Sequence, residues 1–273
     1  EIIFDIQYIR KAGLGGNLTP FLATSTTQEL YMISYYDYLA NIDFYKSFET
    51  GDLRREVTFH DRMKIKIGTV SNIEVYFDPA TDPLIGTWRR TDDNSLVARS
   101  IVNASVPGFR KFIDTDITAR GNAEEPNYVI LRYSDVLLML AEALNETNNG
   151  PNTEAYSYLN MVRRRAFGKP IGTPDAAIDY ANLSKASFRE AVYTERRKEF
   201  VIEGHAWFDG KRFWDIFTKK VADSSIGADP NLNIRPKQVI DLNRIRQDKY
   251  KLMPFSITQM ELNKELVQNP GWE

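Results

Sequence analysis

The chain has 273 residues, of which 42% are hydrophobic and 12% aromatic, so it can bury a substantial core. With 35 Lys and Arg residues against 37 Asp and Glu residues, its formal net charge of −2 provides no overall field for nucleic acid or an anionic membrane surface. The absence of cysteine excludes disulfides, thiolate metal ligands and a cysteine nucleophile within these residues.

The first part of the chain has the patterns of strands and turns. Residues 1–9 (EIIFDIQYI) and 62–68 (RMKIKIG) alternate between apolar and polar positions, and residues 73–78 (IEVYFD) are rich in strand-forming types. No run reaches the roughly 18 consecutive apolar residues of a membrane helix. Because the chain starts on Glu1, inside a strand-like run and without an initiator Met, we expect it to be part of a longer protein.

The pattern becomes helical from Tyr133 onward. Within residues 133–146, six apolar residues fall at offsets 0, 3, 4, 7, 8 and 11 and form one stripe of an amphipathic helix: Tyr133, Val136, Leu137, Leu140, Ala141 and Leu144. The run NNGPN at 148–152 predicts a turn, and residues 155–166 repeat the helical pattern. These elements predict two antiparallel helices joined by a short turn, similar in size to a tetratricopeptide hairpin.

Two further helices are predicted together with their capping residues. Ser187 and Glu190 have the spacing of a capping box, and we expect that helix to continue to Gly204, which is suited to a left-handed stop. The same spacing at Thr258 and Glu261 predicts a last helix near the end of the chain. The predicted fold class is mainly helical, with tetratricopeptide-like hairpins, long loops and a few short strands.

The third predicted helix carries charged residues on its apolar side. At about 100° per residue, Glu195 and Glu199 fall at the centre of the apolar stripe, with Arg196 and Glu203 toward its edge. Two carboxylates one turn apart repel each other and resist burial unless they are paired. We therefore expect these four residues to form a buried ionic brace with neighbouring helices. The candidate partners are Arg132, Arg163, Arg164, Arg165 and Arg212.

Two other interpretations of these acids remain open. A carboxylate pair can perform acid and base chemistry, so a glycan-cleaving hydrolase that depends on Glu195 is the competing hypothesis. A metal site built from Glu203, His205 and Asp209 is a weaker alternative, because the sequence lacks His-Glu-x-x-His. We predict no catalytic residue, no metal and no cofactor, and the balanced charge argues against nucleic acid as a partner.

Several motifs, taken in order along the chain, resemble one known family. They are ILRYSDVLLMLAEALNE (130–146), AYSYLNMVRRRAF (155–167), FREAVYTERRKEFVIEGHAWFDGKRFWD (188–215) and LVQNPGW (266–272). Together they are similar to the C-terminal half of the SusD/RagB family. GDLRR (51–55) and FRKF (109–112) also stand where members of that family carry Asp-x-Arg and a Lys-Phe/Tyr step.

The resemblance implies a function without chemistry. SusD-like proteins are lipid-anchored outer-membrane proteins of Bacteroidetes that cover a TonB-dependent, SusC-type transporter at the cell surface. They capture oligosaccharides, or peptides in some members, and deliver them to the transporter. The family's lipidated N-terminal cysteine and first helical repeats lie in an N-terminal half that is not present in this chain, and we expect that half to be a partner of these residues.

Ligand contacts are expected on exposed aromatic side chains. Sugar rings lie flat on aromatic rings while their hydroxyls meet Asn, Asp and Arg side chains. The candidates are Trp88, Tyr35, Tyr36, Tyr38, Tyr76 and Phe77. Trp88 is the first choice, because residues 87–95 (TWRRTDDNS) supply polar groups beside it.

The domain hypothesis is a single domain over residues 1–273. Residues 1–127 form its strand- and loop-rich part, which we expect to face the ligand; residues 128–218 form the helical-repeat-like part, and residues 219–273 form a loop and the C-terminal helix. A nutrient-binding protein is the favoured function. The alternatives are the hydrolase above and a scaffold that binds no small ligand.

Overall fold

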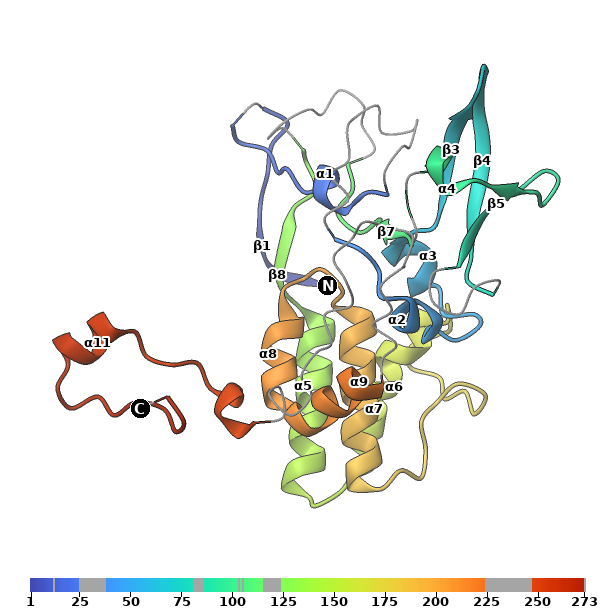
Figure 1. The fold of residues 1–273 in the computed structure, drawn as a ribbon. Coiled ribbons are helices and arrows are strands. Elements are labelled where there is room, and N and C mark those ends of the chain that lie inside the picture. The colour runs from blue at the N-terminus through green and yellow to red at the C-terminus, as the bar shows by residue number, and fades with distance from the viewer. Residues whose placement is uncertain are drawn as a thin grey trace. The chain divides into compact units, whose positions relative to one another are not determined.

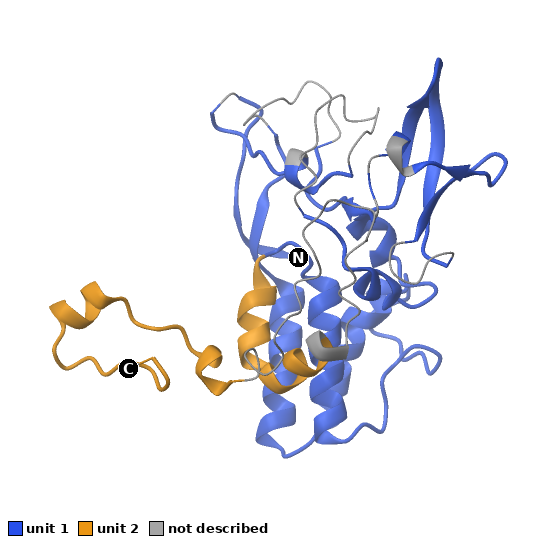
Figure 2. Cartoon of the chain, viewed as in Figure 1, with its two compact units in different colours: residues 1–203 blue, residues 204–273 orange. Residues whose placement is uncertain are grey.

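The computed structural model divides the chain into two compact units, residues 1–203 and residues 204–273 (Figure 2). The boundary lies inside the segment 128–218 that the sequence assigned to one helical part, and each unit is described by itself. No helix in the described part of the chain is long and apolar enough to cross a membrane. The described residues are 1–11, 13–24, 38–80, 86–102, 104, 106–114, 124–223 and 247–272.

Three long helices form the helical part of unit 1: α5 (Tyr133–Thr147), α6 (Thr153–Ala166) and α7 (Lys185–Glu199). They pack against one another, and α5 and α6 form the antiparallel hairpin that the sequence predicted (Figure 1). The Asn152 side chain accepts the Ala155 N–H and caps α6. The chain between α5 and α6 is a short turn, as the NNGPN run indicated.

Helix α7 differs from its predicted span at both ends. Its N-cap is Ser184, whose side chain accepts the Ser187 N–H at 3.2 Å, so the expected cap at Ser187 is wrong by three residues. The helix ends at Glu199 rather than continuing to Gly204. The turn that follows places Ile202 at φ 63°, a left-handed conformation that a β-branched residue rarely adopts.

Among its described residues, the strand-rich part of unit 1 contains three small antiparallel sheets, which Figure 1 shows beside the long helices. Two of them pair β1 (Ile2–Ile6) with β8 (Tyr128–Arg132) and β2 (Phe59–His60) with β7 (Gly108–Phe109). The third is a four-stranded meander of β3 (Arg62–Ile67), β4 (Val70–Asp78), β5 (Thr87–Arg90) and β6 (Leu96–Val97). Four short helices accompany these sheets: α1 (Thr19–Leu22), α2 (Ile42–Lys46), α3 (Arg54–Thr58) and α4 (Arg99–Val102).

An aromatic core joins the short helices to the sheets. The Phe59 ring, 1% exposed, lies 4.9 Å from the ring of Tyr45, 5.3 Å from Phe48 and 5.7 Å from Phe109, measured between centroids. Burial of one such side chain stabilises the fold by roughly 1.5–3 kcal/mol. The core therefore fixes α2, which carries Tyr45, against the strands.

Unit 2 contains α8 (His205–Arg212), α9 (Trp214–Asp223), the 3₁₀ helix η1 (Asp248–Lys251) and α11 (Ile257–Leu262). Ser256 and Gln259 form the capping box of α11, two residues before the pair that the sequence predicted. In the described residues of both units the predicted class is confirmed: helices dominate, α5 and α6 form a helical hairpin, and the strands are short.

Candidate functional site

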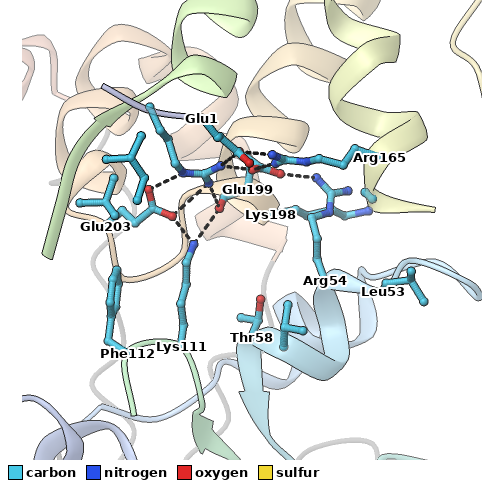
Figure 3. Close-up of a pocket in the computed structure, with 15 residues that line it drawn as sticks. Glu1, Leu53, Arg54, Thr58, Lys111, Phe112, Arg165, Lys198, Glu199 and Glu203 are labelled. Atoms are coloured by element: carbon cyan, nitrogen blue, oxygen red, sulfur yellow. Dashed lines mark hydrogen bonds and ion pairs between the residues drawn. The ribbon is translucent and has the colours of Figure 1, made fainter. Parts of the chain in front are cut away.

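A cavity of about 930 Å³ opens in unit 1 between the helical part and the strand-rich part (Figure 3). Its lining combines ionic and apolar side chains. The ionic residues are Glu1, Arg54, Lys111, Arg132, Arg165, Lys198, Glu199 and Glu203. The apolar residues are Ile2, Leu53, Val57, Phe112, Val129 and Ala166.

Helix α7 and the turn after it bring Glu199 and Glu203 to this cavity, whereas Glu195 lies outside its lining. Glu195 and Glu199 lie one helical turn apart, and Glu203 follows in the turn. Their exposed fractions are 0%, 4% and 5%, so the three acids that the sequence placed on the apolar side are buried. Buried carboxylates cost several kcal/mol each unless cations and hydrogen bonds compensate them.

Glu195 is compensated from two directions. Arg163 Nη1 donates to Glu195 Oε1 at 3.0 Å, and the Tyr180 hydroxyl donates to the same oxygen at 3.2 Å. Arg54 Nη1 lies 2.8 Å from Glu195 Oε2 as an ion pair, although its angle is not that of a hydrogen bond. Arg54 is itself held by Asp52 in a bidentate pair, with N–O distances of 2.9 and 2.7 Å.

Glu199 lies between three guanidinium groups. Arg132 and Arg165 donate to Glu199 Oε1, and Arg54 Nη1 is 3.5 Å from Oε2. Burial alone would raise the pKa of Glu199, but the positive charges of Arg132, Arg165 and Arg54 outweigh it and lower the pKa to about 2. The carboxylate is therefore ionised at any physiological pH.

Glu203 connects the brace to the loop after β7. Arg132 donates to its carboxylate from Nε at 2.9 Å and from Nη2 at 3.0 Å. Lys111 Nζ also donates to Glu203 and to the Glu199 backbone oxygen, the latter at 3.0 Å (Figure 3). Burial lowers the pKa of Lys111 below its ordinary value. Segments far apart in the sequence are thus joined through one buried acid.

The remaining charges of the brace form two side branches. Arg196 pairs with Asp135 at 2.6 Å, which ties α7 to α5. Arg163 also binds Glu49, at 2.5 Å, and Lys198 Nζ lies 3.2 Å from the same carboxylate. The hydrogen bond from Arg163 is the largest cause that lowers the pKa of Glu49 to about 2.

The structure shows which of the predicted arginine partners contact the acids of the brace. Arg132, Arg163 and Arg165 reach the acids as expected, whereas Arg164 pairs with Asp179 and Arg212 with Asp209. The sequence reasoning missed Arg54, Lys111, Glu49, Asp52 and Lys198. The motifs GDLRR and FRKF contain three of these residues, so they were a usable signal that we did not connect to the charged stripe.

Glu199 is unsuited to act as a general acid at neutral pH. A general acid needs a carboxyl group whose pKa is raised toward the working pH, and Glu199 has a pKa of about 2. Glu195 exposes no surface through which a substrate could reach it. In the described ranges, no group of three or more Asp, Glu or His side chains is arranged to hold a metal ion.

Two predicted ligand contacts are corrected by their burial. Trp88 is 1% exposed and donates its indole N–H to the Ala104 backbone oxygen at 3.0 Å. Phe77 is 4% exposed, with its ring centroid 5.5 Å from that of Trp88. Both side chains point to the core from paired positions of β4 and β5, so neither ring has a face for a sugar.

The other candidates have different surroundings. Tyr76 lies next to Phe77 on β4 and therefore points to the opposite, open face of the sheet, where it is half-buried. Tyr38 is 55% exposed. Tyr35 and Tyr36 lie outside the described residues.

Comparisons with known proteins agree over the whole chain. A family model described as the SusD family matches residues 1–272. SusD-like protein P2 of Formosa agariphila is 27% identical over 100% of this chain and 48% of its own length.

Two solved structures share the fold. The crystal structure of a SusD homolog from Bacteroides thetaiotaomicron is 25% identical, with a TM-score of 0.62, and matches 100% of this chain and 52% of that one. Surface glycan-binding protein A from Bacteroides fluxus is 23% identical, with a TM-score of 0.53, and matches 99% of this chain and 50% of that one. The chain therefore spans about half the length of these relatives.

Proposed function

This chain belongs to the SusD family, and from that membership we propose that it is part of a nutrient-binding protein that captures oligosaccharides at the outer membrane. We propose that the captured glycan passes to a TonB-dependent transporter of the SusC type and that a lipid anchor holds the protein at the outer membrane. The observation that carries the proposal is the match of the SusD family model to residues 1–272. The motif resemblance pointed to the same family.

The relatives support a glycan as the ligand. One solved protein of the same fold is named a surface glycan-binding protein. Of the aromatic candidates, Tyr76 and Tyr38 are accessible among the described residues, and they are the proposed stacking positions.

The proposed mechanism is binding without turnover. Stacking on an aromatic ring and hydrogen bonds to polar side chains hold a sugar with no change in covalent bonds. The state of the buried acids supports this proposal over the hydrolase, because each of Glu195, Glu199 and Glu203 already contacts at least two cationic groups. Their role is to hold the helices and loops together.

One experiment separates the three hypotheses. The full-length gene product that carries this chain is titrated by calorimetry with a panel of oligosaccharides and, separately, a peptide pool. The same mixtures are assayed for new reducing ends. We expect binding of at least one glycan and no reducing-end release.

Two variants make the result decisive. Glu195→Gln alters the brace, and Glu261→Gln is a matched change at an exposed glutamate of α11. Reducing-end release that disappears in Glu195→Gln and persists in Glu261→Gln would establish the hydrolase. If no glycan and no peptide binds, the hypothesis of a scaffold without a small ligand is favoured. Co-purification of a TonB-dependent transporter with the tagged protein from membranes tests the delivery step.

A further inference from the structure

The open face of the four-stranded sheet gathers cations in spite of the chain's net negative charge. On β3, Met63 and Ile65 point inward, so Arg62, Lys64 and Lys66 point outward and are exposed. On β4 and β5 the outward positions include Glu74, Tyr76, Asp78 and Arg89. We call these seven residues the sheet face. It carries four cations and two acids, within a chain of net charge −2.

The two acids of the sheet face are already occupied. Asp78 accepts a hydrogen bond from Arg89 Nε at 2.7 Å. Glu74 stands opposite Lys64 in the strand register, yet its carboxylate pairs with Arg62, at 3.4 Å. Lys64 and Lys66 have no ion-pair partner in the described part of the chain. Successive outward positions of a regular strand are roughly 6.4–6.8 Å apart along the backbone, so Lys64 and Lys66 form a row of two lysines on β3, with a register irregularity between Ile65 and Ile67.

An aromatic ring lies beside this row and is held in place. Tyr76 pairs with Arg62 on one side and with Arg89 on the other, in one line across β3, β4 and β5. The Arg62 guanidinium carbon is 6.0 Å from the centroid of the Tyr76 ring. The Tyr76 hydroxyl donates to Asn94 Oδ1 at 2.5 Å, and Arg89 donates to the Asn94 backbone oxygen at 2.9 Å. The hydroxyl end of the ring is therefore held by Asn94, which Arg89 also contacts.

Protection of an edge strand explains some of this pattern. β3 is an edge of the sheet, and lysines on an edge strand discourage pairing with other chains. That requirement is met by charge alone. It does not require a tyrosine on the neighbouring strand, positioned between two arginines by a hydrogen bond to Asn94.

We propose that the sheet face binds an acidic oligosaccharide, one that carries carboxylate or sulfate groups along its length. Tyr76 supplies a surface for one sugar ring, Arg62 lies beside it, and Lys64 and Lys66 meet anionic groups on the neighbouring sugars. This inference rests on the proposed glycan-binding function and specifies the chemical class of its ligand. Figure 1 shows the β3–β4 hairpin extending away from the long helices of unit 1.

The test uses one oligosaccharide in two charge states. Oligogalacturonate and its methyl-esterified form have the same backbone and differ in carboxylate charge, and sulfated galactan oligosaccharides test the other anion. Each is titrated by calorimetry into the full-length gene product at low and high salt. We expect the acidic forms to bind more tightly than the esterified form, with an affinity that falls as salt rises.

Paired variants locate the binding site. Lys64→Gln combined with Lys66→Gln is expected to weaken acidic-glycan binding roughly fivefold, because it removes both lysine charges that have no ion-pair partner among the described residues. Lys11→Gln combined with Lys264→Gln makes the same change of charge at exposed lysines elsewhere and should leave the affinity unchanged. Tyr76→Ala should weaken binding of acidic glycans further than Tyr76→Phe.

The outcomes distinguish this inference from the proposed function. If neutral glycans bind and the Lys64/Lys66 variant binds all glycans normally, the sheet face is not the site and the inference fails, while glycan binding stands. If no glycan of either charge binds, the proposed function fails as well. Binding to anionic lipid vesicles but to no acidic glycan would identify the sheet face as a membrane contact and also overturn the inference.

Discussion

In the helical part of unit 1, Glu195 and Glu199 are buried and each faces at least two guanidinium groups, whereas on the sheet face Lys64 and Lys66 are exposed with no acid paired to them in the described ranges. The difference follows from the exposure of these charges to solvent. A buried charge must be compensated within the fold, while an exposed one is compensated by water and stays available to a ligand. Charge that holds the fold and charge that can bind are therefore separated in this chain.

The largest effect is expected from breaking the brace. Arg132→Met leaves Glu199 and Glu203 buried with fewer partners, and removal of one side of a buried pair costs about 3–5 kcal/mol. The free energy of unfolding from urea titration measures this loss. Lys64→Met removes the same charge from the sheet face and should change stability by no more than about 0.5 kcal/mol. Equal losses in the two variants would contradict the comparison.

A second prediction separates the two aromatic candidates of the sheet. Trp88→Ala should lower the free energy of unfolding by about 3–5 kcal/mol, because it empties a fully buried site and leaves the Ala104 carbonyl without its donor. Tyr76→Ala on the opposite face should cost roughly 1 kcal/mol. Thermal unfolding of both variants tests this order, and a Tyr76 loss as large as that of Trp88 would place Tyr76 in the core.

A third, smaller effect concerns pH. Burial and the positive charge of Arg110 lower the pKa of His60 to about 4, whereas an unfolded histidine titrates near 6.5. The unfolded chain therefore binds a proton first as pH falls, and the folded state loses stability between about pH 6.5 and 4. Between pH 7 and 5 the expected loss from this residue is about 2 kcal/mol.

The control for the pH effect is His60→Asn, whose amide oxygen can still accept the Thr24 N–H that His60 Nδ1 accepts at 3.1 Å. In this variant the loss between pH 7 and 5 should shrink by about that 2 kcal/mol. Glu49 and Glu199, with pKa values of about 2, keep their contribution in this range and lose it only at more acidic pH. An unchanged slope in His60→Asn would exclude His60 as the source.

The smallest expected change in stability concerns the N-cap of α7. Ser184→Ala removes the side chain that accepts the Ser187 N–H and should cost about 1 kcal/mol. Ser187→Ala, at the position favoured by the sequence pattern, should cost clearly less. Urea titration of the two variants side by side decides which serine is the cap.

The sequence predicted local features better than distant contacts. The periodicity of the apolar residues was enough for the α5–α6 hairpin and for the inward direction of Glu195 and Glu199, because both depend on neighbours within a few turns. Arg54 lies 145 residues before Glu199, and no periodicity connects such positions. The partners of a buried charge are set by tertiary structure.

Trp88 illustrates a second limit of prediction from the sequence. Its strand is four residues long, with a polar run after it, so alternation could not reveal which way the indole points. The direction is fixed by the pairing of Trp88 with Phe77 on β4, a feature of the sheet rather than of the segment. The outward direction of Tyr76 could be predicted from the sequence, because Tyr76 lies next to an inward-facing residue on a strand with clear alternation.

Hydrogen exchange of the full-length gene product, with and without a saturating acidic oligosaccharide, tests the separation of binding charge from structural charge most directly. We predict added protection in β3, β4 and β5 and no change in α7. Protection confined to residues 195–203 around the cavity, with the sheet unchanged, would contradict the account and place the ligand on the brace.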